Sequence, residues 1–567
     1  MTRRAASWRA IRRRTVGQPP VSQPPVSQRA VSRRAVTAVV ATTLAALLSV
    51  AHLGTLGDIA ETTDASWVDR EMVQSSLSVG GPLSCATLGR YRSASQARMT
   101  TGRLLGRDLS TVVDVAGVSV TNPGTGASAV PATTTPVGAD AFRNNLTITA
   151  LNTALSTDLS GVLTLPLAGT NLGAYAQYAR AGSEGKAVAA AGLISDTGAL
   201  ALGSAATPAT PASTPAGDAA SIDLAKLAPA TVALAGVNLG VGAVGARAAL
   251  QGCQLSSNVP SAERSYGIAS LNLRASVPAV KTVGTTLTTQ LGAVSTTVDG
   301  LKTTLQSTLK NVVGPLLGGT AGTSTANITL DLAALNTELL TPLSDGMVTV
   351  DLRNGLVTVD VAELLSGSGG LNGQAPNTQL LLTTLNTTVP NRVTALLNTW
   401  KTQVQQRLTA VLNAAAVELR VTVAPLGLGT PKIVVINSTL GGLVQGTGTT
   451  SIDGAAPAGG LLSILTSSLL PALGAVVNTA LFAAPAGAVP AVASALTPVI
   501  AAVAPALTPV MAAVTSVLTL TVNVQDSPAS GVHRVSALRI GVLASTAAGS
   551  ELRLATAVAG PVTSLTP

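Results

Sequence analysis

Histidine, the usual general base and metal ligand near neutral pH, is almost absent from this chain. The 567 residues include 2 histidines, His52 and His533. No Gly-x-Ser-x-Gly elbow is present to supply a nucleophile for a triad through His533, and no histidine lies near a cysteine to complete a zinc site. We predict that His533 is a solvated turn residue. We expect no catalytic residues, no metal site and no enzymatic activity.

A glycine motif offers the next possible chemistry. Gly240-Val-Gly242-Ala-Val-Gly245 matches the dinucleotide-binding fingerprint and follows a predicted strand. That fingerprint needs a βαβ unit, in which the helix N-terminus receives the phosphates. No such unit follows, and the chain has 55 glycines to produce chance matches. We therefore expect a glycine-rich strand or bulge, no nicotinamide or phosphate cofactor, and no cofactor of any other kind.

Two aspartates recur in paired Thr-Val-Asp segments, at Asp351 and Asp360. Paired carboxylates serve glycosidases, and carboxylates with further oxygen ligands bind calcium. Both aspartates alternate with valines that would face a core, so we expect them to face solvent without a functional role.

The chain has 2 cysteines, Cys85 and Cys253. In an exported protein, an even pair of cysteines indicates one disulfide. In the chain-entropy model, a loop this long would add about 4–5 kcal/mol of stability. Two buried free thiols are the alternative.

The first 57 residues have the pattern of an export signal. Nine arginines lie within the first 34 residues, no acidic residue precedes Asp58, and an uncharged apolar run follows at residues 35–51. This order defines a secretory signal peptide. We predict a signal peptide over 1–57, cleavage after Ala51, Gly57 or Ala65, and a secreted or cell-surface protein. Without those nine arginines the formal net charge of +9 falls to zero, so nucleic acid is not an expected partner.

The composition favours large sheets and small side chains. Only 10% of the residues are charged and 2% are aromatic, whereas ordinary soluble domains carry about 25% charge. Few aromatic residues are available for a carbohydrate-stacking platform. Trp400 lies on the apolar stripe of a predicted helix, and we expect it in the core.

Hydrophobic periodicity divides the remaining chain into two regions, 58–278 and 279–567. Short apolar runs with turn residues between them indicate a β-rich first region. They include a predicted hairpin over 187–202 and strands over 231–250 and 265–277. The second region begins with an apolar stripe over 280–316 at a mean step of about 3.6 residues, which predicts one long amphipathic helix.

Helices and strands then alternate through the second region. Strands are predicted at 328–332, 347–352 and 356–361, and Asn354-Gly355 between the last two is a strong hairpin signal. A helix over 390–417 leads into strands at 418–423 and 432–437. Strands near 520–524, 535–543 and 552–558 follow a third helical tract. The fold class expected is α+β: an antiparallel β-rich N-terminal region, then long amphipathic helices each followed by β-hairpins.

The third helical tract, residues 461–518, carries no charge and resembles two membrane spans in length. Six prolines interrupt it and alanine dominates it, so we expect kinked helices buried against the sheet. Membrane or lipid contact through 461–518 is the alternative. No hydrophobic stop segment or sortase motif occurs near the C-terminus, so we expect no covalent C-terminal anchor.

As a whole, the chain resembles the choice-of-anchor G family of actinobacterial surface proteins. The resemblance rests on Thr101-Gly-Arg-Leu-Leu-Gly-Arg-Asp-Leu-Ser110, Asn171-Leu-Gly-Ala-Tyr-Ala-Gln-Tyr-Ala179 with Ala187-Val-Ala-Ala-Ala-Gly192, Ser265-Tyr-Gly-Ile-Ala-Ser-Leu-Asn-Leu273, and the hairpin over 347–361. The resemblance implies export and varied surface attachment among members. It implies no established activity and no catalytic residues.

These observations lead to one functional expectation and one rival. We expect an exported cell-envelope or secreted structural or adhesive protein without catalytic activity. Its expected partners are cell-wall or envelope components, or other surface proteins. The rival is an envelope protein that binds lipid or another apolar ligand, which the uncharged tract and the narrow apolar stripes suggest.

Overall fold

The fold is described from a computed structural model. It describes residues 90–104, 107–109, 117–145, 163–164, 175–201, 220–227, 232–253, 261–365, 370–380, 382–425, 430–457, 459, 465–542 and 550–565. The predicted signal peptide and Cys85 lie outside the described residues. Within these residues, long helices accompany four sheets in which every strand pairing is antiparallel, which confirms the predicted α+β class with a strand-rich N-terminal region.

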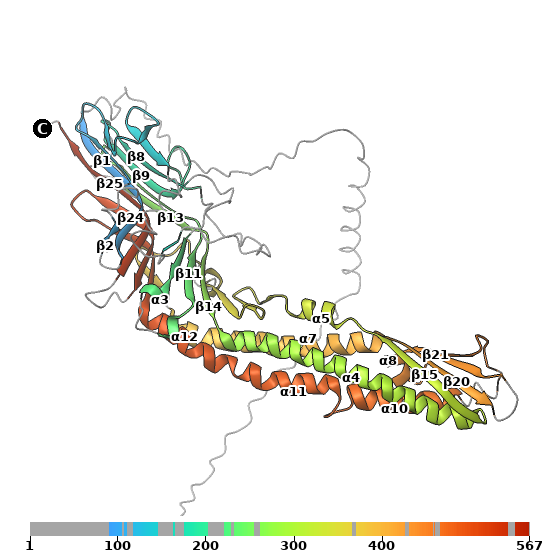
Figure 1. The fold of residues 1–567 in the computed structure, drawn as a ribbon. Helices are drawn as coiled ribbons and strands as arrows, with labels where there is room; N and C mark the ends of the chain where they lie inside the picture. The colour runs from blue at the N-terminus through green and yellow to red at the C-terminus, as the bar shows by residue number, and fades with distance from the viewer. Residues whose placement is uncertain are drawn as a thin grey trace, which may run out of the picture. The chain divides into compact units, whose positions relative to one another are not determined.

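The largest sheet joins the start of the described chain to its end. Its strand order is β19-β23-β24-β25-β1-β3-β4, with β2 paired to β1. The strands are β1 Tyr91–Leu104, β2 Arg107–Asp108, β3 Val118–Asn122, β4 Ser128–Val130, β19 Thr378–Leu380, β23 Leu518–Asp526, β24 His533–Val542 and β25 Ser550–Ser564. The predicted C-terminal strands are present as β23, β24 and β25, and β1 lies between β25 and β3. Figure 1 shows β1 in blue beside β25 in red.

A six-stranded sheet packs face to face on this large sheet. Its order is β13-β12-β9-β8-β6-β5. The strands are β5 Thr135–Pro136, β6 Ala141–Asn145, β8 Tyr175–Ala181, β9 Lys186–Leu193, β12 Val244–Gln251 and β13 Ser261–Ile268. Alanines fill much of the space between the sheets, including Ala97, Ala189, Ala248 and Ala557, all of them fully buried. Small side chains on both facing sheets explain how the chain builds a core with so few aromatic residues.

The third sheet crosses the boundary between the two predicted sequence regions. Its order is β16-β17-β18-β14-β11-β10-β7. The strands are β7 Leu163–Thr164, β10 Ala220–Asp223, β11 Val237–Val241, β14 Leu271–Ser276, β16 Leu343–Ser344, β17 Val348–Asp351 and β18 Leu356–Asp360. β17 and β18 form the predicted Asn-Gly hairpin, with Gly355 at φ 69°. Because β18 pairs with β14, strands on both sides of residue 278 share one sheet.

Two long helices confirm the strongest periodicity signals. α4 spans Pro278–Leu316 and α7 spans Leu385–Ala414. The predicted stripe of α4 is buried, from Val280 through Leu309. Threonine hydroxyls on its other face donate to the carbonyl four residues earlier, as Thr289 does to Thr285 at 3.0 Å. The exposed face of α4 is therefore rich in hydroxyl groups, and its charged residues are Lys281, Asp299, Lys302 and Lys310.

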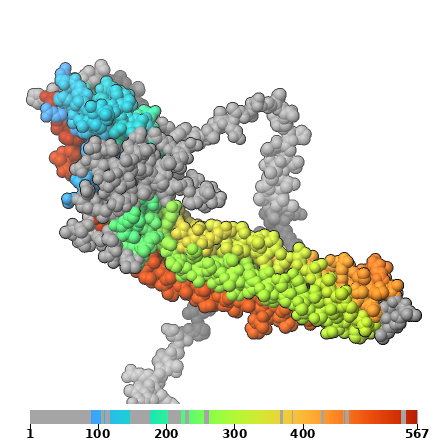
Figure 2. Space-filling model, viewed as in Figure 1, coloured from blue at the N-terminus to red at the C-terminus, as the bar shows by residue number. Residues whose placement is uncertain are grey.

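The uncharged tract forms helices whose large side chains point inward, but they pack mainly on other helices and not against a sheet as predicted. α10 Leu470–Val477, α11 Ala488–Ala501 and α12 Val503–Val517 belong to it. α11 packs on both α4 and α7, and α12 packs on α7; Figure 2 shows the surfaces of α4 in green and α11 in orange-red side by side. Leu496, Ile500 and Leu507 are buried, whereas the exposed stripe includes Thr497, Ala501 and similar small residues.

Two local predictions were wrong. The segment predicted as a strand at 328–332 instead ends β15, Gly319–Thr329, and then begins α5, Leu332–Leu339. The Asp331 carboxylate accepts from the Ala334 amide at 2.9 Å, and this N-cap starts the helix. The predicted hairpin over 187–202 is only an isolated bridge between Ile194 and Leu200, because β9 pairs instead with β8 and β12.

Candidate binding face

A four-stranded sheet lies beside the C-terminal half of α4. Its order is β15-β20-β21-β22, with β20 Ala416–Pro425, β21 Lys432–Thr439 and β22 Thr449–Ile452. α4 ends at Leu316, Gly318 turns the chain at φ 60°, and β15 runs back along the helix. The short helix α8, Leu440–Val444, follows β21. At 1.5 Å per residue, the 39 residues of α4 place about 58 Å between the N-terminal end of the helix, beside β17 and β18, and its C-terminal end at this sheet.

One face of this sheet is buried against α4, and the other carries polar side chains. Alternation along β20 buries Val417, Leu419, Val421 and Val423. Among the described elements, α4 and α8 make the main packing contacts with the sheet from outside it. We call the opposite surface the outer face. Its side chains, all at least partly exposed, are Thr325, Asn327, Glu418, Arg420, Thr422, Ile433, Val435, Asn437, Thr449 and Ser451.

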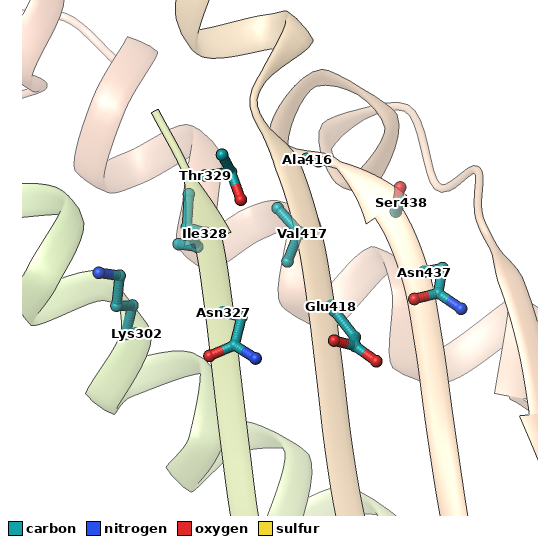
Figure 3. A pocket seen from close by; sticks show the side chains of 9 residues that line it. All are labelled: Lys302, Asn327, Ile328, Thr329, Ala416, Val417, Glu418, Asn437 and Ser438. Atoms are coloured by element: carbon teal, nitrogen blue, oxygen red, sulfur yellow. The ribbon is translucent and has the colours of Figure 1, made fainter. Parts of the chain in front are cut away.

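Three amide and carboxylate side chains form a row across the outer face. Asn327 on β15 pairs in register with Glu418 on β20, and Glu418 pairs with Asn437 on β21. Thr449 on β22 continues the row. The Asn327, Glu418 and Asn437 side chains project from neighbouring strands at the same height (Figure 3). Since adjacent strands lie about 4.8 Å apart, the three side chains span about 10 Å, and the row with Thr449 spans about 14 Å.

A hollow of about 630 Å³ includes this row. It is lined by Lys302, Asn327, Ile328, Thr329, Ala416, Val417, Glu418, Asn437 and Ser438 (Figure 3). Lys302 comes from α4, and the other residues come from the three strands β15, β20 and β21. Small-molecule sites have volumes of about 300–1,000 Å³. The hollow is therefore large enough for a ligand of a few rings.

The charged groups of this surface neutralise one another. Arg420 Nε donates to Glu418 Oε1 at 2.7 Å. Lys302 Nζ, at the edge of the hollow, donates to Asp299 Oδ1 at 2.7 Å. Both pairs are exposed or half-buried, so they contribute little to stability. The outer face therefore has hydrogen-bonding groups but almost no net charge, and Asp299 balances the charge that Lys302 of α4 brings to the edge of the hollow.

The aspartates singled out in the sequence have structural roles. Asp351 Oδ1 accepts from the Arg353 amide at 2.9 Å and holds the hairpin turn. Asp360 Oδ1 accepts from the Ala362 amide at 2.8 Å and caps α6, Val361–Leu364. Asp351 lies opposite Leu356 in the hairpin, and Asp360 lies opposite Asn272 of β14. The two aspartates therefore do not form a carboxylate pair.

The glycine motif also has a structural role. β11 ends at Val241 and antiparallel β12 begins at Val244, so Gly242 lies at a corner between two sheets. A Cβ at Gly242 would lie 2.2 Å from Ser270 Oγ, which explains the need for glycine. Gly240 lies in β11 and Gly245 lies in β12, so the motif is part of two strands and the corner between them, and the element that follows it is β12.

Two further sequence candidates, the cysteine pair and Trp400, have different outcomes. Cys253 is 5% exposed, directly after β12, and is not a free thiol. Its predicted partner Cys85 lies outside the described residues, so the Cys85–Cys253 disulfide stays a prediction. Trp400 is 2% exposed, as predicted, and its Nε1 donates to the Leu339 carbonyl at 2.8 Å.

His533 is the first residue of β24 and lies, partly buried, beside Arg264 of β13, so the prediction of a solvated turn residue was wrong. Its Nδ1 lies 3.0 Å from the Arg264 guanidinium. Because a guanidinium can only donate, Nδ1 accepts, and the proton of the neutral ring is on Nε2. Burial first, and then the charge of Arg264, lower the pKa of His533 below its ordinary 6.5. Both effects disfavour the imidazolium form.

This lowered pKa predicts an acid-side loss of stability. As the pH falls below about 6.5, the unfolded chain binds a proton at residue 533 more readily than the folded chain does. The contribution of neutral His533 to the free energy of unfolding is therefore complete above that pH and is lost progressively below it. We expect thermal unfolding of His533→Gln to depend less on pH than the wild type between about pH 7 and 5. Equal slopes for the two proteins would contradict this assignment.

Within the described residues, one helical stretch is long and apolar enough to cross a membrane. It covers Ala488–Val517, with a mean hydropathy of 1.8 in its most apolar window, a third of which is buried. This stretch comprises α11 and α12, whose large side chains pack on α4 and α7 as described above.

The architecture defines a class of protein: an antiparallel α+β protein in which a helical bundle carries a small sheet, one face of which is covered by no other described element. The chain belongs to the family described as Domain of unknown function (DUF8394), whose model matches residues 95–560. No curated protein matches the chain. No solved structure matches it either.

The row on the outer face was not recognised from the sequence. Glu418 and Asn437 lie in strands that were predicted, at positions that alternate with buried Val, Leu and Ile, so their outward direction could have been inferred. Asn327 lies in β15, which was mostly missed. Without β15 the row cannot be assembled, because its register with β20 depends on long-range pairing.

Proposed function

We propose that this protein is an exported, non-enzymatic adhesive protein of the cell envelope, and that it binds envelope components through the outer face. The observation that carries the proposal is the position of that face: a polar sheet surface at the opposite end of α4 from β17 and β18, on which no other described element packs. The arginine-rich, then apolar, N-terminal sequence supports export. Cell-wall or envelope components and other surface proteins are the expected partners.

The absence of catalytic activity remains part of the proposal. Among the described residues, no group of three or more His, Cys, Asp or Glu side chains could hold a metal ion. His533 faces a guanidinium instead of a nucleophile. The Glu418 carboxylate in the hollow is engaged by Arg420. These arrangements favour binding over acid–base chemistry.

The rival proposal, binding of lipid or another apolar ligand, has less support. The large side chains of α11 and α12 pack into the core, and small Ser, Thr, Ala and Pro residues make up their exposed stripe. Lipid insertion is driven by large apolar or aromatic side chains. We therefore favour the adhesive role.

The proposal is tested by sedimentation with isolated envelopes of the native host. The protein is the full chain produced with its own leader. The double variant Asn327→Arg/Asn437→Arg places two bulky charges on the outer face. Its matched control, Thr289→Arg/Thr296→Arg, places the same charges on the exposed face of α4. We expect about tenfold weaker envelope binding for the first variant and no change for the second. Equal binding by the two variants, or no envelope binding by the wild type, would exclude the proposal.

A further inference from the structure

We infer that the outer face binds an uncharged polysaccharide through vicinal hydroxyl groups. This inference rests on the proposed adhesive function and names its ligand class. The first argument is the spacing of the row. Asn327, Glu418 and Asn437 present one polar group per strand, and the strand separation of about 4.8 Å is close to the length of one sugar residue. A chain lying across the strands would meet one polar side chain per sugar.

The second argument is the chemistry of these groups. A sugar hydroxyl donates one hydrogen bond and accepts others. Each asparagine amide both donates and accepts, and the Glu418 carboxylate accepts. The neighbouring outer-face hydroxyls of Thr325, Thr422 and Thr449 can do either. This mixed inventory fits neighbouring hydroxyl groups better than it fits a ligand that only accepts, such as a phosphate.

The third argument is charge. The Glu418–Arg420 pair, with its shortest contact at 2.5 Å, leaves the centre of the face neutral. Charged polymers are selected by surfaces of the opposite sign. The outer face has no such excess, so an uncharged ligand fits it best. Apolar Val435 and the 44% exposed Ile433 lie on the same face and can contact the C–H groups of sugar rings.

The side chains of the outer face also predict how strongly a sugar binds. None of the four strands contains Phe, Tyr or Trp, so stacking on an aromatic ring does not contribute. Neutral hydrogen bonds exchanged with water add little each. Single sugars should therefore bind weakly, and tight adhesion should require a polymer that engages several protein copies.

The experiment measures binding of the full chain to immobilised neutral glucan, mannan and galactan, with a polyuronic acid as the charged comparison. We expect binding to at least one neutral polymer, and about tenfold weaker binding for Asn327→Ala/Asn437→Ala than for Thr289→Ala/Thr296→Ala. Glu418→Gln tests whether the bound polymer is neutral or anionic. It removes the charged acceptor, so it should weaken binding to a neutral polymer. It also frees the positive charge of Arg420, which would strengthen binding to an anionic polymer.

Treated envelopes separate this inference from the proposed function. Periodate cleaves vicinal diols, and protease removes surface proteins. Envelope binding that is lost after periodate and survives protease supports the polysaccharide inference. Binding that survives periodate, is lost after protease and still requires Asn327 and Asn437 would overturn the inference while leaving the adhesive function standing. A gain of binding in Glu418→Gln would overturn it as well.

Discussion

Trp400→Ala is expected to lower the free energy of unfolding by about 3–5 kcal/mol, the usual cost of removing a buried tryptophan side chain. Trp400 is 2% exposed on the buried stripe of α7, and its indole N–H donates to the Leu339 carbonyl, the last residue of α5. The substitution removes both the packing within the bundle and the hydrogen bond between α7 and α5. Denaturant unfolding followed by far-ultraviolet circular dichroism measures the loss.

Trp400→Phe is the matched control, because it keeps most of the apolar volume and removes only the N–H donor. It should cost about 1–3 kcal/mol for the buried Leu339 carbonyl left without its partner. Losses that are equal in the two variants would mean that the hydrogen bond, and not packing, dominates at this position.

Alanine substitutions at two glycines of α4 are expected to change stability in opposite directions. A Cβ at Gly284 would lie 2.5 Å from the Leu352 carbonyl oxygen, where the helix crosses the turn between β17 and β18. The helix or the turn must move to relieve this clash, and the free energy of unfolding should fall by about 1–3 kcal/mol. A Cβ at Gly300 would meet nothing within 4 Å. There, the higher helix propensity of alanine should add about 1 kcal/mol.

The two variants control for each other, because they make the same chemical change in the same helix. Their melting temperatures should move to opposite sides of the wild-type value. A stabilising Gly284→Ala would show that α4 does not pack closely on the hairpin turn.

Local patterns predicted the helices well and the sheets only in part. α4 can be predicted from its own sequence alone, because apolar residues at helical spacing identify the buried face of the helix. The β17–β18 hairpin is equally local, since Asn354-Gly355 specifies the turn. In contrast, β1 pairs with β25 across more than 450 residues, and no local signal indicates such a partner.

β15 shows why the candidate site could not be predicted. Its sequence over 319–327 contains only Gly, Thr, Ala, Ser and Asn, so it lacks the apolar alternation that marks a strand. It becomes a strand because β20 offers hydrogen bonds and α4 covers one side. The outer face, which depends on β15, is therefore a product of tertiary structure.

The pairing of β1 with β25 has a mechanical consequence. Tyr91 lies opposite Ser564, so the two strands have these ends at the same side of the ladder. Pulling these ends apart would break the hydrogen bonds one pair at a time, as a zipper opens. A load along the axis of β25 acts differently: β1 holds residues between Glu551 and Ser564, and β24 holds residues between Ser550 and Ala559, so both sets of hydrogen bonds must break together. The fold thus resists tension along β25 better than it resists the peeling of β1 from β25 at Tyr91 and Ser564.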